Sequence, residues 1–299
     1  MTFHDNPEPR PPGSFPARGR RDMVARDTAV RGRAAHNMTE TAEGADAWDP
    51  AQYLRFAGHR LRPALDLLNR IDLERPETVT DLGCGAGNVT RWLAQRWPGA
   101  AVTGVDGSAA MLAKAAEALP ELRWQQADIA AWAPDRPQNL IYSNAALHWL
   151  PDHETLFPKL AGDLAPGGVL AVQMPRNFAE PSHTAMADAA RNGPWIETLE
   201  PMLKPAPVHE PAFYHRLLAP RVSALDLWET TYFQLLDGNN PVAEWTKGTW
   251  LRPMLDALGG DRRAGFEAAY RARIAAAYPP GPDGRTLFPF RRLFMVAKR

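Results

Sequence analysis

The residues best placed to do chemistry lie in one short segment, Asp81-Leu82-Gly83-Cys84-Gly85-Ala86-Gly87-Asn88. Glycine at every second position permits a tight turn from a strand into a helix and lets a ligand touch bare backbone. The spacing differs from the G-x-G-x-x-G fingerprint of dinucleotide-binding proteins, in which a helix N-terminus holds a pyrophosphate. Asp81 ends the preceding strand, and its carboxylate would repel phosphate but attract an ammonium and a sulfonium group. The segment therefore predicts a site for a positively charged nucleoside.

Polar side chains also follow the next three strands. Asp106 ends the segment Thr103-Gly104-Val105-Asp106, and an acid about 20 residues past a glycine loop can accept both ribose hydroxyls of a nucleoside. Asp106 could instead cap the helix that follows. Asp128, in Ala127-Asp128-Ile129, could accept the exocyclic amine of adenine, and Asn144 follows the fourth strand. Four polar groups at consecutive strand ends predict one ligand-binding edge.

Strands and helices that alternate must position these side chains. Apolar runs predict strands at Glu77–Leu82, Ala101–Val105, Leu122–Ala127, Asn139–Ser143 and Val169–Met174. Helical spacing predicts helices from Trp48 to Leu68, at Asn88–Trp97, at Ser108–Leu119, and over Leu156 to Leu164, the last ending at Gly167–Gly168. Short loops between alternating strands and helices predict an α/β fold, a doubly wound Rossmann-like parallel sheet covered on both faces.

The alternation stops after Met174. We expect a core over residues 46–175, a proline-rich cap insertion over 176–223, a core strand over 224–235, a helical cap insertion over 236–285 and a final core strand over 286–299. The sheet then has about seven strands. The two late insertions should form a helical substrate cap over the carboxyl edge of the sheet, where open α/β sheets bind ligands.

The first 45 residues contain many prolines and arginines and few large apolar side chains. Such a segment cannot offset its ordering entropy and is expected to be disordered. A nucleic-acid-binding arm is one alternative, and translation from Met38 is another. Deleting residues 1–37 is expected to leave activity unchanged.

The composition limits the class of protein. The 34 basic and 34 acidic side chains cancel, so no overall field would attract nucleic acid or a membrane. The single cysteine, Cys84, excludes an internal disulfide. No apolar run reaches the roughly 18 residues of a membrane span, and no apolar signal core is present at the start. A cytoplasmic protein with neither a nucleic-acid nor a membrane partner is expected; the number of subunits is left open, and a monomer is consistent with the sequence.

Together, these motifs resemble those of class I S-adenosylmethionine-dependent methyltransferases. The resemblance implies S-adenosylmethionine as the cofactor, with its methionine part at the glycine loop, its ribose at Asp106 and its adenine at Asp128 and Ile129. The expected cofactor-binding set is Tyr53, Asp81, Gly83, Gly85, Gly87, Asp106, Met111, Asp128, Ile129 and Asn144.

A closer resemblance, over about residues 46–299, is to the trans-aconitate methyltransferase family. It is carried by Trp48-Asp49-Pro50, Leu147-His148-Trp149-Leu150-Pro151-Asp152-His153, Glu180-Pro181-Ser182-His183, Leu251-Arg252-Pro253 and Arg292-Leu293-Phe294. The family's leucine-glutamine-tryptophan turn reads Leu147-His148-Trp149 here, and residues 191–207 fit the family poorly. The resemblance implies methyl transfer to one carboxylate of trans-aconitate, giving a monomethyl ester, which requires no general base because the carboxylate is already ionised at pH 7.

A substrate with three negative charges needs cationic partners, and arginine binds carboxylates through two parallel hydrogen bonds. The expected substrate-binding residues are Arg252, Arg292, Arg60 and Trp149, with Arg55 and Lys247 as weaker candidates. Asn144, His148 and Trp149 are expected to position the reacting groups, with packing as the alternative role of His148 and Trp149. Tyr53 could close over the cofactor or belong to the core. No metal is expected.

Several other functions stay open. The acceptor could be another small acid, an amine, an acyl-carrier substrate, or a phenol, for which His148 would be the candidate base. A nicotinamide-dependent dehydrogenase is disfavoured by the glycine spacing and by Asp81. A non-catalytic cofactor-binding regulator is disfavoured by the Asn144 loop and the two arginines, Arg252 and Arg292.

Overall fold

The computed structural model describes residues 61–248 and 250–299. Within these ranges the chain forms a seven-stranded sheet in the order β3-β2-β1-β4-β5-β7-β6. The strands are β1 (Thr78–Leu82), β2 (Ala101–Asp106), β3 (Arg123–Gln126), β4 (Gln138–Asn144), β5 (Leu164–Pro175), β6 (Ala224–Leu236) and β7 (Thr286–Lys298). The first five are parallel, and β7 lies antiparallel between β5 and β6. The doubly wound α/β class predicted from the sequence is confirmed.

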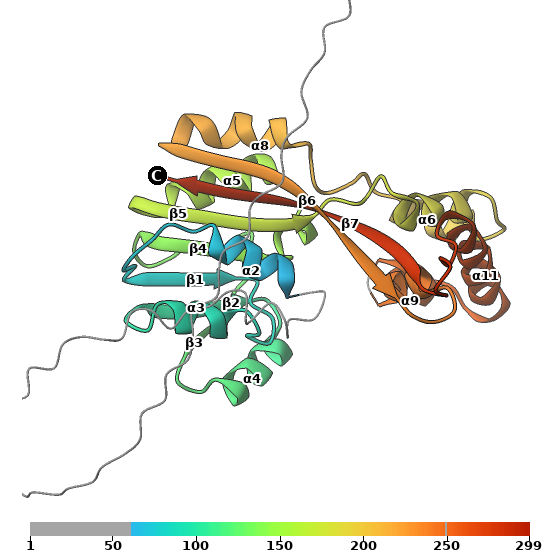
Figure 1. Ribbon diagram of the computed structural model, residues 1–299, viewed down its shortest axis with the longest axis horizontal. Helices are drawn as coiled ribbons and strands as arrows, with labels where there is room; N and C mark the ends of the chain where they lie inside the picture. The colour runs from blue at the N-terminus through green and yellow to red at the C-terminus, as the bar shows by residue number, and fades with distance from the viewer. Residues whose placement is uncertain (1–60, 249) are drawn as a thin grey trace, which may run out of the picture. The chain divides into compact units, whose positions relative to one another are not determined.

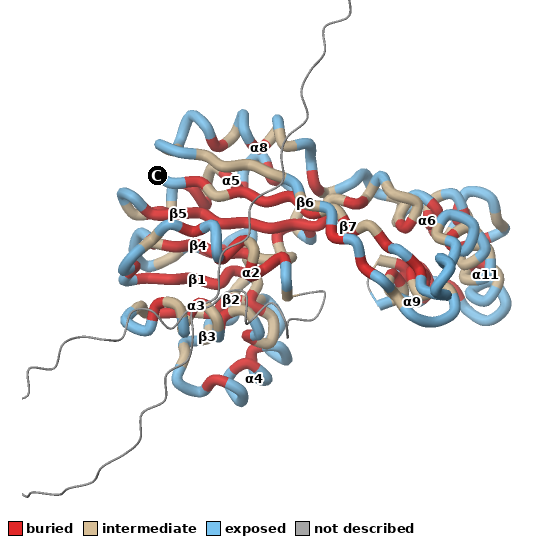
Figure 2. The backbone as a smooth tube through the Cα atoms, in the orientation of Figure 1, coloured by how far each residue is buried: buried red, intermediate tan, exposed pale blue. Residues whose placement is uncertain are grey.

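Helices cover both faces of this sheet (Figure 1). One face packs against α2 (Arg62–Asn69) and α3 (Thr90–Arg96), which bury Leu65, Leu68 and Leu93 against Tyr142 and Phe294. The other face packs against α5 (His153–Gly162) and α8 (Pro211–Leu218). At one end of the sheet, α4 (Ala109–Ala118) packs beside β2 and β3. The buried central strands stand out in Figure 2.

The last two strands leave the sheet and lead into a second group of helices (Figure 1). β6 and β7 each have 13 residues and remain paired from Ala224↔Lys298 to Leu236↔Thr286. Around their far ends lie α6 (Pro181–Arg191), α7 (Ile196–Leu199), α9 (Pro241–Lys247), α10 (Leu251–Asp256) and α11 (Gly260–Ala277). These helices share a separate apolar cluster with Phe288 and Phe290 of β7, and we call them, with the ends of β6 and β7, the cap. The described residues also form three short 3₁₀ turns: η1 (Leu147–Trp149), η2 (Glu200–Met202) and η3 (Ala219–Arg221).

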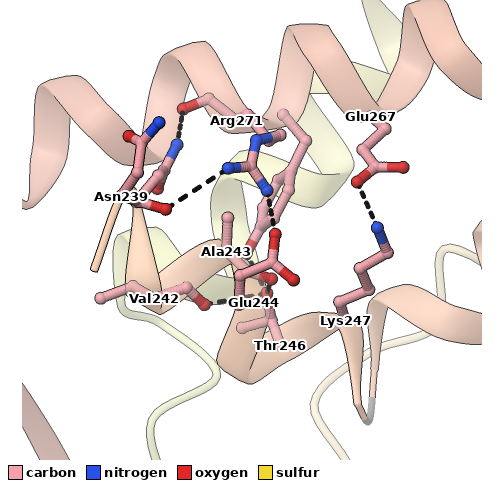
Figure 3. Close-up of polar contacts among 10 residues, drawn as sticks. Asn239, Val242, Ala243, Glu244, Thr246, Lys247, Glu267 and Arg271 are labelled. Atoms are coloured by element: carbon pink, nitrogen blue, oxygen red, sulfur yellow. Dashed lines mark hydrogen bonds and ion pairs between the residues drawn. The ribbon is translucent and has the colours of Figure 1, made fainter. Parts of the chain in front are cut away.

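Ion pairs and hydrogen bonds fasten α9 to α11 within the cap (Figure 3). The Nζ atom of Lys247 lies 2.6 Å from Oε1 of Glu267, and Arg271 pairs with Glu244. The Nδ2 atom of Asn240 donates to the backbone oxygen of Arg271 at 2.7 Å. These contacts hold α9 and the residue before it against α11.

Two expectations differ from the structure. α5 ends at Gly162, not at Gly167–Gly168, and both of those glycines lie inside β5. The register of β4 against β5 shifts between Gln138 and Leu140, so the two glycines belong to an irregular strand. The segment 176–223 does not all lie in the cap, because Val208, Tyr214 and Leu218 pack on the sheet with α5.

Other expectations fall outside the described residues: the N-terminal extension over 1–45 and the helix from Trp48 as far as residue 60. No helix in the described part of the chain is long and apolar enough to cross a membrane.

Candidate functional site

The glycine loop joins β1 to the turn before α3 in a backbone conformation that favours glycine. Gly83, Gly85 and Gly87 have φ values of +82°, +55° and +77°, in the left-handed region that side chains rarely adopt. The amides of Gly83 and Cys84 donate to the carbonyl of Val105 at 2.8 and 3.0 Å, which attaches the loop to β2. A Cβ atom at Gly83 would lie 2.2 Å from Cβ of Ala146. The loop therefore presents bare backbone at the carboxyl ends of β1 and β4.

Asp81 is a buried acid behind this loop. The residue is only 2% exposed, and the Thr90 hydroxyl donates to its Oδ2 atom at 2.6 Å. Burial raises the pKa of Asp81 from 3.8 to about 7; the Thr90 hydrogen bond lowers this pKa, and the nearby carboxylate of Asp106 raises it further. A cation placed beside the loop would stabilise the ionised form, so Asp81 favours a positively charged ligand.

Asp106 closes the other side of the loop. Its Oδ2 accepts from the amide of Gly85 at 2.8 Å, and its Oδ1 accepts from the amide of Ser108 at 2.8 Å. The residue therefore contacts the glycine loop and also the start of α4. Asp128 is exposed and accepts from the amide of Ala130 at 3.0 Å. Ile129 lies close to Gly83, since a Cβ there would come 3.3 Å from Cδ1 of Ile129.

A cavity of about 430 Å³ opens between the glycine loop and the cap. Its walls come from the loop, from the carboxyl ends of β4 and β5, from Phe290 and Arg292 in the first half of β7, and from the cap. The lining residues are Leu61, Asp81, Gly83, Cys84, Gly85, Ala86, Asn88, Val89, Asn144, Ala145, His148, Trp149, Pro175, Asn177, His183, Trp245, Thr246, Trp250, Phe290 and Arg292. Such a volume suits a small ligand.

Strand register explains why Asn144 and Arg292 reach the same cavity. Asn144 pairs with Gln173, and Arg292 pairs with Pro175, two residues further along β5. Paired residues point to the same face of a sheet, as do residues two apart on one strand, so these side chains form one row. The row lies on the face covered by α2. Oδ1 of Asn144 is buried without a hydrogen-bond partner among the described residues.

Arg292 supplies the positive charge of this cavity. The residue is 7% exposed, and its guanidinium lies over the Phe290 ring at 4.3 Å from the centroid. Among the described lining residues it is the only arginine or lysine. A buried guanidinium whose flat face is covered keeps its charge and can bind a carboxylate side-on.

His148 and Trp149 lie on η1, directly after the Asn144 loop. His148 is 4% exposed, and burial, helped by Arg292 and by the histidines His153 and His183, lowers its pKa to about 3. Trp149 is 55% exposed and stacks on Trp250 of the cap at 4.6 Å between ring centroids. Both residues line the cavity.

The structure does not bring every predicted residue to the cavity. Arg252 lies on the exposed side of α10, with its side chain 73% exposed and its Nε 3.5 Å from the carboxylate of Asp256, and it does not line the cavity. Lys247 pairs with Glu267 and does not line the cavity. Met111 is 43% exposed on α4, also away from the cavity. Tyr53, Arg55 and Arg60 lie outside the described residues.

Several of the described lining residues were not predicted from the sequence, among them Asn177, His183 and Trp250. His183 belongs to the Glu180-Pro181-Ser182-His183 segment, and Trp250 directly precedes Leu251-Arg252-Pro253. These motifs carried a family resemblance, but neither histidine nor tryptophan has a spacing that marks it as a ligand group. The fold of the cap brings them to the cavity.

The chain is similar to known methyltransferases in a conserved domain and over most of its length. A family model described as a methyltransferase domain matches residues 79–168. The chain is 54% identical over 252 residues to a trans-aconitate 2-methyltransferase from Azoarcus sp. (strain BH72), covering 84% of this chain and 99% of that protein. It is 49% identical over 255 residues to a trans-aconitate 2-methyltransferase from Methylobacterium radiotolerans, covering 84% of this chain and 98% of that protein. The solved structure of the YcgJ protein from Bacillus subtilis shares the fold, with a TM-score of 0.52 at 13% identity over 80% of this chain and 98% of that one.

The sheet order and the glycine loop, with the matching domain model, define a class I S-adenosylmethionine-dependent methyltransferase. The similarity to the two trans-aconitate 2-methyltransferases extends over nearly their full length and identifies the family within this class. The chain belongs to the trans-aconitate 2-methyltransferase family.

Proposed function

We propose that this chain transfers the methyl group of S-adenosylmethionine to one carboxylate of trans-aconitate and releases the monomethyl ester. The observation that carries this proposal is the cavity in which the glycine loop, Asn144 and the buried Arg292 meet. The cavity combines a site for a cation, at the glycine loop beside Asp81, with a site for an anion at Arg292. The names of the two relatives support the choice of acid.

The residues of the loop fit this cofactor. Asp81 is a buried acid that a positive charge would stabilise in its ionised form. The glycines let a ligand approach the backbone, and Asp106 lies beside them with both carboxylate oxygens at the loop and the start of α4. When bound, the cofactor supplies an activated methyl group on its sulfonium. Asp81 would contact the methionine part, and Asp106 the ribose hydroxyls.

The histidines of the cavity agree with an acceptor that is already ionised. Burial lowers the pKa of His148 to about 3 and that of His183 to about 4. A base this weak removes a phenol proton poorly, because efficient proton transfer needs a pKa near the working pH. A carboxylate with a pKa near 4 needs no deprotonation at pH 7. These two residues therefore favour a carboxylate over a phenol.

Arg292 would bind and orient the acidic substrate. A charge-assisted hydrogen bond contributes about 1.5–3 kcal/mol, and the two parallel N–H groups of a guanidinium also fix the plane of the carboxylate. Asn144, at the end of β4, lies between the glycine loop and Arg292 along the sheet edge. Holding an oxygen in line with the methyl group can contribute about 7–11 kcal/mol to the rate through positioning.

A screen of small acids tests this proposal. The purified chain is incubated with methyl-labelled S-adenosylmethionine and each of trans-aconitate, cis-aconitate, isocitrate, a simple phenol and a simple amine. We expect label to enter trans-aconitate with the highest kcat/KM, and mass spectrometry to show one added methyl group that mild alkali removes. Label in the phenol or amine, with none in any acid, would contradict the proposal.

A cytoplasmic location and the absence of a nucleic-acid partner rest on the balanced charge and the single cysteine. A dehydrogenase is the distant alternative; it would bind NADH at the loop and not S-adenosylhomocysteine.

A further inference from the structure

Asn177 and His183 line the cavity but have no part in the steps described above. Asn177 lies between β5 and α6, and His183 lies in the first turn of α6. Asn177 is 0% exposed, and its Oδ1 atom has no hydrogen-bond partner among the described residues. A buried amide oxygen left without a partner is costly, so a ligand that satisfies this amide would regain that free energy.

The cap holds the pair in place through the backbone of Ser182. Tyr270 donates from its hydroxyl to the Ser182 carbonyl at 2.9 Å, and the Ser182 amide donates to the Tyr278 hydroxyl at 3.2 Å. The Ser182 side chain lies 3.1 Å from Nδ1 of His183, and Nδ2 of Asn177 lies 3.5 Å from the same nitrogen. Tyr270 of α11 and Tyr278, directly after α11, thus hold the backbone of Ser182 and with it the position of the His183 ring.

The protonation state of His183 determines which hydrogen bonds this pair can form with a ligand. A neutral imidazole has one donor nitrogen and one acceptor nitrogen. If Nδ1 of His183 accepts from the Asn177 amide nitrogen, the ligand meets the Nε2–H donor of His183 and the amide oxygen of Asn177, which is an acceptor. If the Asn177 amide is flipped so that its oxygen and nitrogen exchange places, its oxygen accepts from Nδ1–H; the ligand then meets the amide N–H donor of Asn177 and the acceptor Nε2 of His183. The neutral pair therefore offers one donor and one acceptor, whereas protonated His183 with Asn177 offers the two donors that a carboxylate requires.

We propose that Asn177 and His183 form the site for a second, non-reacting carboxylate of the substrate, and that His183 takes up one proton from solvent when a polycarboxylate binds. This inference rests on the proposed function. A second carboxylate site would let the chain distinguish a polycarboxylate from an acid with a single carboxylate. Arg292 contributes one positive charge to the cavity, and protonated His183 contributes a second. Together they balance two of the three charges of trans-aconitate.

The charges around His183 agree with this. Burial lowers its pKa to about 4, so His183 is neutral in the ligand-free site at pH 7, and a bound carboxylate would raise that pKa. His148 and Arg292 face it across the cavity, and Tyr278 contacts Ser182. Glu180, on the same segment, is neutralised by Arg291 at 2.7 Å. Proton uptake at His183 predicts that trans-aconitate affinity falls as the pH rises above 7.

Calorimetry measures both parts of this inference without turnover. The chain is saturated with S-adenosylhomocysteine and titrated with trans-aconitate at pH 7.5 in two buffers of different ionisation enthalpy. For the unaltered chain we expect uptake of close to one proton. His183→Gln keeps an N–H donor but cannot take up a proton, so it should abolish the uptake and weaken binding about tenfold or more. Asn177→Leu should weaken binding by a similar factor and leave S-adenosylhomocysteine affinity unchanged.

His215→Gln is the matched control, because His215 is exposed on α8 away from the cavity; uptake and affinity should stay as in the unaltered chain. If the unaltered chain binds trans-aconitate with no proton uptake, or if His183→Gln retains it, this inference is overturned while the proposed function stands. If the unaltered chain binds no trans-aconitate, both are overturned. If a variant fails to fold, the unaltered chain still tests the inference, because binding of trans-aconitate without proton uptake overturns it.

Discussion

At the scale of single residues, burial separates two arginines that look alike in the sequence. Arg292 is 7% exposed and lines the cavity, whereas the side chain of Arg252 is 73% exposed beside Asp256. Both were predicted as substrate ligands because each has apolar neighbours. Asp256 lies four residues after Arg252 in the sequence, a spacing that favours a helix-surface ion pair. That signal could have excluded Arg252; nothing local distinguishes the residues Asn177 and His183, which only the fold of the cap brings to the cavity.

This difference leads to a paired mutational prediction. Arg292→Met should raise the KM for trans-aconitate about 10- to 100-fold, since it removes a charge-assisted contact, and should leave S-adenosylhomocysteine affinity unchanged. Arg252→Met should leave both within a factor of two or so, as an exposed ion pair contributes little. Steady-state kinetics and calorimetry measure these values. A large effect of Arg252→Met with none of Arg292→Met would reverse the assignment.

Asp81 links cofactor binding to pH. Its pKa of about 7 means that the carboxylate becomes protonated as the pH falls below 7, and a protonated acid no longer attracts an ammonium group. S-adenosylhomocysteine affinity should therefore fall by up to about tenfold for each pH unit below 7. Asp81→Asn should bind the ligand weakly and remove this dependence between pH 6 and 8. Calorimetry across that range gives the slope, and an unchanged slope in the variant would assign the titration to another group.

The raised pKa of Asp81 also affects the stability of the ligand-free fold, which should fall as the pH rises. Because the pKa of Asp81 is raised in the folded state from 3.8 to about 7, the carboxylate destabilises the ligand-free fold increasingly as the pH rises between these values. The cost is at most about 4 kcal/mol at pH 8. Asp81→Asn should therefore raise the Tm of the ligand-free chain at pH 8 and have little effect at pH 4.

At the scale of elements, the β1–α3 turn could be predicted because its chemistry is local. Glycine at three alternate positions, 83, 85 and 87, indicated the tight turn, and all three have positive φ in the structure. The predicted end of α5 was wrong. Gly167–Gly168 is a typical helix-stop signal, but in the structure these two glycines lie in β5 next to a register shift. Pairing with a distant strand overrode the local signal, and single-sequence patterns do not contain that information.

The turn gives a prediction with its own control. Gly83→Ala would place a Cβ 2.2 Å from Ala146 at a φ of +82°, whereas Gly85→Ala, at +55°, would meet nothing within 4 Å. Gly85→Ala should cost about 1–2 kcal/mol of unfolding free energy from the backbone conformation alone. Gly83→Ala should cost more and also weaken S-adenosylhomocysteine binding. Denaturant unfolding measures both; equal costs would mean that the close approach to Ala146 relaxes without penalty.

At the scale of the whole molecule, the site depends on contacts between the sheet and the cap. The core was predictable from alternating strands and helices. The cap was predictable only as a region, because the apolar cluster that its helices share forms with the far ends of β6 and β7, which are distant in the sequence from α6. Trp149 on η1 and Trp250 of the cap stack at 4.6 Å, and this contact joins the two parts directly beside the cavity.

A double-mutant cycle tests that connection. Trp149→Ala, Trp250→Ala and the double variant should show a coupling of about 0.5–1.5 kcal/mol in unfolding free energy, as stacked aromatic pairs do. Trp149→Ala combined with Phe233→Ala, an exposed aromatic on β6, should be additive within about 0.3–0.5 kcal/mol. Additivity of the two tryptophans would show that the stack does not join cap and core in solution.

The most direct measurement is a crystal structure of the chain with S-adenosylhomocysteine and trans-aconitate bound together. We predict the adenosyl group along Gly83–Gly87 with its ribose hydroxyls on Asp106, and a carboxylate of the acid on the Arg292 guanidinium inside the cavity. An adenosyl group located away from this loop, or an acid bound at Arg252 with the cavity empty, would contradict the assignment of both halves of the site.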